Sequence, residues 1–381
     1  MFPRVLPPPG ESAFLLGPRA TGKSTWLQQH FADAVSYDLL DTSLALRLAR
    51  EPALLAREIE GLGLEPGAWV VIDEIQKVPA LLDEVHRLMQ RRGIRFLLSG
   101  SSARKLKRGG ANLLAGRALR QDFFPLVSKE LGAARKIDEI VFGTLPQAVL
   151  SERPQSYLVA YTETYIKEEV QAEALTRNVG GFARFLEVAA RQNGMVTSTA
   201  SIARDAQVAR QTVQGYFEVL VDTLLGFWLP AWRPKRATKV VSHPKFYLFD
   251  AGVARALSGR IAYPPTSEEF GPIFETYLLH EIRAWLSYSG HAYPLAYFRT
   301  HDGVEVDLLL ESVRGHIAIE IKAGREWRSG FSKGLRRISE EIPGVRCFGV
   351  FTGTRPQKVE GVEVLPYARF LERLWEGTLI D

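Results

Sequence analysis

Short apolar segments alternate with amphipathic stretches in the first third of the chain. Clear apolar runs occupy residues 13–16, 69–72 and 95–98, and residues 35–39 and 120–124 show weaker ones. Each run is too short for a typical helix, whereas strands buried on both faces have this length and composition. Helical patterns separate the runs, as expected of strands that lie parallel in one sheet. The pattern therefore predicts an α/β fold with a parallel sheet and helices on both of its faces.

The pattern changes after Pro125 and again after residue 244. We therefore predict four segments, at residues 1–125, 126–180, 181–244 and 245–381. The second is mostly helical, with a long amphipathic stretch at residues 156–176 that contains no Gly or Pro. The third shows three helical stretches, the second of them short, and then an apolar run at residues 227–232 that predicts a β-wing. From residue 268 onward the fourth reads as helix, three strands, helix and strand.

Composition sets limits on the class of protein. The 381 residues are too many for one ordinary core, and 46% hydrophobic with 24% charged residues is typical of globular proteins. No apolar run reaches the roughly 18 residues that cross a bilayer, and the N-terminal MFPRVLPPPG lacks the apolar core of a secretory signal. The single cysteine, Cys347, excludes an internal disulfide. We expect a cytoplasmic protein without a membrane partner.

The first chemical motif is GPRATGKS, which follows the apolar run at residues 13–16 and opens a helix at residues 23–31. It is a full G-x-x-x-x-G-K-[ST] match in a strand–loop–helix context. Glycines let the backbone wrap phosphates, and the loop N–H groups and the helix N-terminus face the anion. Lys23 neutralises phosphate charge and the Ser24 hydroxyl is a magnesium ligand. ATP with Mg²⁺ is the predicted ligand, and a chance glycine turn before a helix is the competing interpretation.

The second half of this predicted site is WVVIDE, at residues 69–74. Its four apolar residues predict a buried strand that ends in an acidic pair. We expect Asp73 to hold magnesium and Glu74 to orient and activate the attacking water, which hydrolysis needs and mere binding does not. An exposed acidic strand end is the alternative. The predicted nucleotide-binding residues are Gly17, Pro18, Arg19, Ala20, Thr21, Gly22, Lys23, Ser24, Thr25 and Asp73.

A predicted strand at residues 35–39 lies between these two motifs. This order of elements resembles the AAA-like ATPases, in which a further strand is inserted between the strands of the two motifs. The segment IDEIQKVPALLDEV, the GSS triplet and the LAGRA segment together resemble a prokaryotic AAA-type family over nearly the whole chain. The resemblance implies a C-terminal winged-helix and nuclease-like region. Ser99, Ser101 or Ser102, at the next strand end, is a candidate sensor of the γ-phosphate.

Arg117 follows the glycine of the LAGRA segment. It is our candidate for an arginine that reaches the nucleotide of a neighbouring subunit, and this role implies a ring-like or other homo-oligomer. A surface arginine or a structural salt bridge is the competing interpretation.

The segment at residues 181–244 resembles a winged helix, whose third helix enters the major groove of DNA. The polar residues that begin this helix are Arg210, Gln211, Thr212 and Gln214. Cations then gather beside Trp228 and Trp232, an arrangement that suits a nucleic-acid backbone. These cations are Arg233, Lys235, Arg236, Lys239 and Lys245. DNA is therefore the predicted partner, and docking of a protein on the same fold is the alternative.

Two predicted strands near the C-terminus, at residues 304–311 and 316–322, carry charges at alternate positions. In the first, Glu305 and Asp307 are expected on one face, opposite Val306 and Leu308. In the second, Glu320 and Lys322 share a face, opposite three isoleucines that belong in the core.

An acid on one strand and E-x-K on the next form an economical site for Mg²⁺, with Mn²⁺ as a possible substitute. Asp307 and Glu320 are the predicted ligands, Lys322 positions or activates the nucleophile, and Glu275 from the preceding helix completes the set. The site resembles the PD-(D/E)xK nuclease superfamily, with Val306 in place of the proline. This resemblance implies metal-dependent DNA cleavage by Asp307, Glu320 and Lys322. Ordinary alternating charges, or a nuclease fold that has lost activity, are the alternatives.

Together these motifs predict an ATP-hydrolysing protein that binds and processes DNA, with ATPase-driven remodelling and Mg²⁺-dependent cleavage, branched DNA being one candidate substrate. A second hypothesis is a nucleotide-controlled regulatory switch with an inactive nuclease-like scaffold. A third, a stand-alone ATPase chaperone, is disfavoured by the basic cluster. Stimulation of ATP turnover by DNA separates the first two.

Overall fold

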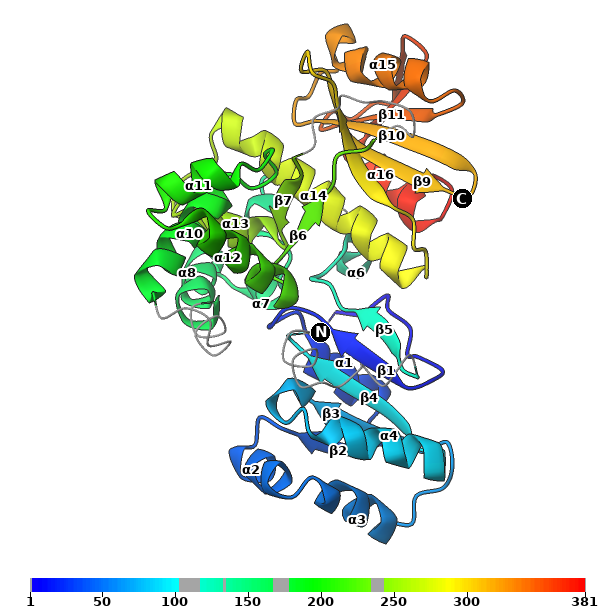
Figure 1. Cartoon of the computed structure of the whole chain (residues 1–381). Helices are drawn as coiled ribbons and strands as arrows, with labels where there is room; N and C mark the ends of the chain where they lie inside the picture. The colour runs from blue at the N-terminus through cyan, green and yellow to red at the C-terminus, as the bar shows by residue number, and fades with distance from the viewer. Residues whose placement is uncertain (1, 103–116, 133–134, 167–177, 234–242, 381) are drawn as a thin grey trace. The chain divides into compact units, whose positions relative to one another are not determined.

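The computed structural model divides into two compact units, and Figure 1 labels many of their helices and strands. The N-terminal unit consists of Arg4–Pro125 and Val219–Leu225, and the C-terminal unit of Met1–Pro3, Leu126–Glu218 and Gly226–Asp381. The structure describes residues 2–102, 117–132, 135–166, 178–233 and 243–380.

Five parallel strands form the sheet of the N-terminal unit, which confirms the predicted parallel sheet. They are β1 (Ala13–Leu16), β2 (Val35–Asp38), β3 (Trp69–Asp73), β4 (Arg95–Gly100) and β5 (Leu119–Asp122). Their order is β2-β3-β4-β1-β5, so β4 lies between the two strands that carry the motifs. Because all five run the same way, their C-terminal ends meet at one edge of the sheet.

Helices cover this sheet. They are α1 (Lys23–His30), α2 (Thr42–Arg50), α3 (Ala53–Gly61) and α4 (Leu81–Arg92). Of these, α3 follows another helix, while the others come after a strand. One face of the sheet packs in a single core with α3 and α4, through side chains such as Phe96, Leu55 and Leu88. All four residues of β1 are buried, so both faces of this strand are covered.

The C-terminal unit starts with short helical elements. These are α6 (Ser128–Leu131), η3 (Ile140–Phe142), α7 (Pro146–Leu150), α8 (Pro154–Ala160) and the π-helical turn η4 (Tyr161–Ile166). The amphipathic stretch predicted at residues 156–176 is helical as far as Ile166, since the π-helical η4 continues directly from the end of α8 at Ala160. Residues 167–177 lie outside the described part of the chain.

Three helices and a two-stranded antiparallel sheet follow. They are α10 (Val179–Arg191), α11 (Thr199–Asp205), α12 (Arg210–Asp222), β6 (Gly226–Leu229) and β7 (Lys245–Leu248). Aromatic rings join the helices to the strands, with Phe217 of α12 centred 4.9 Å from Phe185 and 4.6 Å from Phe246. Such contacts between large rings stabilise small modules beyond the burial of their area.

After α13 (Ala251–Leu257), a long helix leads into a six-stranded mixed sheet of order β12-β13-β11-β10-β9-β8. The elements in chain order are α14 (Ser267–Tyr288), β8 (Leu295–Arg299), β9 (Glu305–Ser312), β10 (Gly315–Lys322), η5 (Ser329–Ser332), α15 (Lys333–Glu341), β11 (Arg346–Phe351), β12 (Gln357–Val359), β13 (Val362–Pro366) and α16 (Tyr367–Trp375). One face of the sheet forms an apolar cluster with α14 and α16, and the other face forms one with α15. The sequence pattern missed β12, β13 and α16.

Strand β9 contains a β-bulge near Asp307. Ala296 and Phe298 of β8, two residues apart, pair with Leu309 and Val306, which are three residues apart. One extra residue therefore lies in β9 and breaks its alternation. Val306 packs in the cluster beside α15 and Leu308 in the cluster beside α14. The prediction that these two side chains share one face is wrong for this reason.

The described part of the chain contains no helix that is both long and apolar enough to span a bilayer.

Glu281 of α14 is a fully buried carboxylate that joins three elements of the C-terminal unit. It accepts hydrogen bonds from the backbone N–H of Ser128 at 2.7 Å, from the Ser128 hydroxyl at 2.9 Å and from the indole N–H of Trp375 at 2.7 Å. Burial raises the pKa of Glu281 from 4.5 to about 7, and the donors of Trp375 and Ser128 oppose this shift.

We expect a pH-dependent stability from this group. Because the folded pKa exceeds the unfolded one, the stabilisation from proton uptake is full below about pH 4.5 and is lost as the pH rises through 7. Urea unfolding of the wild type between pH 5 and 8 should show a loss of up to about 3 kcal/mol from this group. Glu281→Gln should flatten the dependence, whereas the exposed control Glu376→Gln should not. Equal slopes in Glu281→Gln and wild type would contradict the assignment.

Candidate functional site

The glycine-rich part of the GPRATGKS motif, Gly17 to Gly22, has the sequence of a P-loop, and this P-loop connects β1 to α1 at the C-terminal edge of the first sheet. A Cβ added at Gly17 would lie 2.2 Å from the carbonyl oxygen of Phe123, so the backbone at Phe123 leaves no room for a side chain there. Gly22 has φ 96°, a conformation that side chains strongly disfavour. Both glycines are thus required by the loop geometry itself.

Side chains from α1 and β3 converge at this loop. The Lys23 ammonium donates to the carbonyl oxygens of Gly17 at 2.8 Å and Pro18 at 3.0 Å. The Ser24 hydroxyl donates to a carboxylate oxygen of Asp73 at 2.8 Å. A hydroxyl and a carboxylate in direct contact are the oxygen ligands that magnesium prefers, so Ser24 and Asp73 fit this ion.

The other predicted loop residues shape the loop. Ala20 adopts φ 62°, and the buried Thr21 hydroxyl donates to the carbonyl oxygen of Pro18 at 2.9 Å. Arg19 is half-buried and Thr25 is exposed on α1. These residues stay predicted nucleotide contacts.

Arg4 is a loop residue that the sequence pattern missed. Its guanidinium donates to the carbonyl oxygens of Thr21 at 2.7 Å and Phe124 at 2.6 Å, and it lies 4.1 Å from the centre of the Phe123 ring. Arg4 therefore fixes the P-loop to the chain that follows β5. A single arginine among prolines gives no periodic or motif signal.

Glu74 directly follows β3 and has a strained backbone conformation, with φ 59° and ψ 44°. Its backbone N–H donates to Asp73 at 3.1 Å and to the Ser99 hydroxyl at 3.3 Å, and Ser99 also donates to the Asp73 carboxylate. Left-handed residues other than glycine cost roughly 1–3 kcal/mol and gather at functional sites. The acidic pair is thus held against the end of β4.

Arg117 lies just before β5, at the edge of the sheet opposite the P-loop. The parallel register pairs Ala13 with Leu119, so the residue two positions earlier lies near the start of β1. Its guanidinium donates to His86 of α4 at 2.5 Å. The side chain is therefore remote from the P-loop of its own subunit, and its role toward a neighbouring subunit stays a prediction.

The C-terminal acidic cluster brings together Asp307, Glu320 and Lys322. The Lys322 ammonium pairs closely with Glu320 and lies 3.8 Å from Asp307, while Asp307 accepts the backbone N–H of Ile321 at 2.7 Å. Burial, together with the nearby Asp307 charge, raises the pKa of Glu320 well above its usual range. Burial alone would lower the pKa of Lys322, but the carboxylates of Asp307 and Glu320 raise it.

A second lysine, Lys245 of β7, enters the same cluster. Its ammonium lies 3.1 Å from Glu275 and 2.7 Å from Glu305, and the hydroxyl of Tyr247 also donates to Glu275. Although burial opposes the charge, Glu275, Asp307 and Glu305 raise the pKa of Lys245 above its usual range. Lys245 is therefore an internal counter-ion.

This position corrects the prediction of a basic cluster for DNA. Lys245 is only 3% exposed, so it cannot contact a phosphate backbone as the sequence pattern suggested. Arg233 is exposed, whereas Lys235, Arg236 and Lys239 lie outside the described residues. On α12, the side chains of Arg210, Gln211 and Gln214 are exposed and Thr212 is half-buried.

Two of the three ligands predicted for a metal here, Asp307 and Glu320, lie close together beside Lys322. One oxygen of the buried Glu320, Oε2, has no hydrogen-bond partner, and with Asp307 it offers hard ligands to Mg²⁺ or Mn²⁺. The hydrogen bonds described for Glu275 go to Lys245 and Tyr247 instead. In the part of the chain that the structure describes, no three acidic, His or Cys side chains converge as a metal site. The set Glu275, Asp307 and Glu320 stays a prediction.

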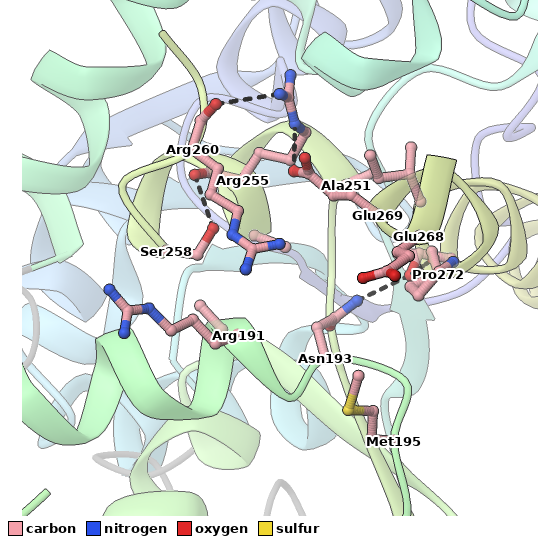
Figure 2. A pocket seen from close by; sticks show the side chains of 14 residues that line it. Arg191, Asn193, Met195, Ala251, Arg255, Ser258, Arg260, Glu268, Glu269 and Pro272 are labelled. Carbon is pink, nitrogen blue, oxygen red and sulfur yellow. Dashed lines mark hydrogen bonds and ion pairs between the residues drawn. The ribbon is translucent and has the colours of Figure 1, made fainter. Parts of the chain in front are cut away.

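A pocket of about 190 Å³ lies elsewhere in the C-terminal unit, between α10, α13 and α14, and is shown in Figure 2. The buried Arg255 in its wall pairs with Glu269 at 2.8 Å and donates to the carbonyl oxygen of Tyr263 at 2.7 Å. Asn193 donates to Thr276 at 2.8 Å. The first of these bonds joins α13 to α14, and the last joins the turn after α10 to α14.

Comparisons with known proteins divide the chain into three matched regions. Residues 10–132 match the family model of an AAA domain, residues 135–262 that of a domain of unknown function (DUF8612), and residues 270–370 that of another, DUF4143. Uncharacterized proteins of Mycobacterium tuberculosis (Rv2008c) and Mycobacterium bovis (Mb2031c) are each 26% identical over 349 residues. Each match covers 89% of this chain and 76% of the relative.

Two solved structures show weak similarity. The Orc1 protein of Aeropyrum pernix in complex with DNA is 15% identical, with a TM-score of 0.24 over 65% of this chain and 86% of that one. Protein VC1899 of Vibrio cholerae is 11% identical, with a TM-score of 0.21 over 83% of this chain and 90% of that one. Scores this low do not support a shared overall fold. The family match and the parallel sheet agree, however, and residues 10–132 are similar to an AAA domain.

Proposed function

We propose that this chain hydrolyses ATP with magnesium. The observation that carries the proposal is the convergence of Lys23, Ser24, Asp73 and Glu74 at one edge of the parallel sheet. Loop N–H groups and the Lys23 ammonium would bind the phosphates, and Ser24 and Asp73 would hold the ion. Bound magnesium would neutralise charge that develops on the phosphate oxygens.

In this proposal Glu74 acts as the base. Its carboxylate accepts a proton from water, the water oxygen forms a bond to the γ-phosphorus, and the bond from that phosphorus to the bridging oxygen of ADP breaks. The hydrogen bonds to Ser99 and Asp73 fix the backbone of Glu74 before substrate arrives.

Glu74→Gln should separate binding from chemistry. The neutral amide cannot accept the proton, so ATP turnover should fall by about 100-fold or more, while affinity for Mg-ATP changes little. Steady-state phosphate release and equilibrium binding of a fluorescent ATP analogue measure the two quantities. Glu65→Gln, an exposed glutamate of the same unit, is the matched control. Wild-type turnover in Glu74→Gln would sink the assignment.

We also propose that Arg117 completes the site of a neighbouring subunit in a homo-oligomer. Its location at the far edge of its own sheet supports action in trans. Turnover per subunit should then rise with protein concentration, and Arg117→Ala should lower the plateau by about 100-fold or more without weakening ATP binding. Arg120→Ala, three residues on in β5, is the control. A full rate in the assembled Arg117→Ala protein would exclude this role.

DNA processing is the use of the ATPase that we favour. The exposed polar start of α12 supports groove contact by a winged-helix module, and the Asp307–Lys322–Glu320 cluster supports a nuclease-like site. Asp307 and Glu320 would hold Mg²⁺ or Mn²⁺, and Lys322 would position the nucleophile and offset charge on the cleaved phosphate. In the competing switch hypothesis this domain is an inactive scaffold.

A panel of linear, single-stranded and branched DNA distinguishes these hypotheses. We expect DNA to stimulate ATP turnover, and Mg²⁺ or Mn²⁺ to support cleavage that Lys322→Ala abolishes and Lys333→Ala retains. Phosphate release and gel analysis of the same samples give both readouts. A slow ATP turnover that does not change when DNA is added, together with no DNA cleavage, would favour the switch hypothesis. Cleavage by Lys322→Ala equal to the wild type would contradict the nuclease-like assignment.

A further inference from the structure

Gln76 lies two residues after Glu74, in the short helical turn η1 (Ile75–Lys77). The turn is closed by a hydrogen bond of 2.9 Å from the backbone N–H of Lys77 to the carbonyl oxygen of Glu74. The side chain of Gln76 is only 4% exposed and folds back toward the end of β4. No role in nucleotide binding follows from its place in the sequence motif.

The carboxamide of Gln76 holds the side chain of Glu74. Its Nε2 donates one hydrogen bond to Glu74 Oε2 and another, of 3.1 Å, to the Ser101 hydroxyl. Ser101 in turn lies 3.4 Å from the same Oε2. Only an N–H group can face a carboxylate oxygen, so the orientation of the amide is fixed, and both of its donors are used.

The other end of the amide shows that packing alone does not explain this residue. Gln76 Oε1 is buried without a hydrogen-bond partner, which costs stability that an apolar side chain would not lose. Oε1 also approaches the backbone so closely that a Cβ at Gly100 would lie 2.7 Å from it. The buried Oε1 is thus unfavourable for stability, whereas Nε2 of the same amide donates to Glu74.

We propose that Gln76 is a positioning residue for ATP hydrolysis and acts through Glu74, an inference that rests on the ATPase function proposed above. Because Gln76 and Ser101 both engage Oε2, the carboxylate has one orientation, which leaves Oε1 to accept the proton of the attacking water. A carboxylate already fixed in this way loses less rotational freedom in the transition state. The hydrogen bonds of the Gln76 amide go to Glu74 and Ser101 rather than to Lys23, Ser24 or Asp73, so Gln76 should affect the rate and not the affinity.

A double-mutant cycle with Gln76→Leu and Glu74→Gln tests this role. Gln76→Leu should lower kcat by about 10- to 100-fold while the Kd for Mg-ATP stays within about twofold of the wild type. The double variant should turn over no more slowly than Glu74→Gln alone, because Gln76 acts only through that carboxylate. A purely structural role would lower turnover in both backgrounds equally.

Gln76→Asn provides a second variant if Gln76→Leu fails to fold. Its amide is one methylene too short to reach Glu74 but remains polar, so it should show the same loss of kcat at unchanged Kd. Unchanged or raised turnover in a folded Gln76 variant overturns the inference, as do equal and additive losses in the cycle. A wild-type chain that binds Mg-ATP without turnover, or does not bind it, overturns the proposed ATPase function and this inference with it.

Discussion

The carboxylate of Asp73 joins three elements of the N-terminal unit. It accepts the hydroxyl of Ser24 from α1, the hydroxyl of Ser99 from β4 and the backbone N–H of Glu74. A carboxylate that is only 7% exposed needs such donors, because an unpaired buried charge is costly. The position of the P-loop helix, the end of β4 and the strained turn at Glu74 all depend on this one side chain.

Much of this unit could be predicted from sequence because its signals are local. The strand–loop–helix order and the acidic pair after an apolar run are contiguous patterns, and parallel strands bring their ends together. Gln76 was missed because Gly100, which leaves room for its amide, ends another strand, and its partner Ser101 lies just after that strand. Arg4 was missed because both of its acceptors are backbone carbonyls far along the chain.

The C-terminal unit was harder to predict because its charges are paired over long separations. Lys245 looks like one member of a basic run, yet its partners Glu275 and Glu305 lie 30 and 60 residues further along the chain. Charge counting cannot distinguish a cation that meets solvent from one that compensates a buried acid. The pairing of Lys322 with Asp307 and Glu320 was easier to predict from the sequence, since E-x-K puts two of the three groups on one strand.

The extra residue in β9 determines on which face of the sheet the carboxylate of Asp307 lies. Loss of Leu308, one of the two residues between Val306 and Leu309, would restore a regular ladder with β8. It would also turn Asp307 toward the apolar cluster beside α14, where Leu308 and Ile319 now pack. The more regular sheet would thus bury a carboxylate away from Lys322. Loss of a single codon here would be a larger chemical change than most substitutions at the same place.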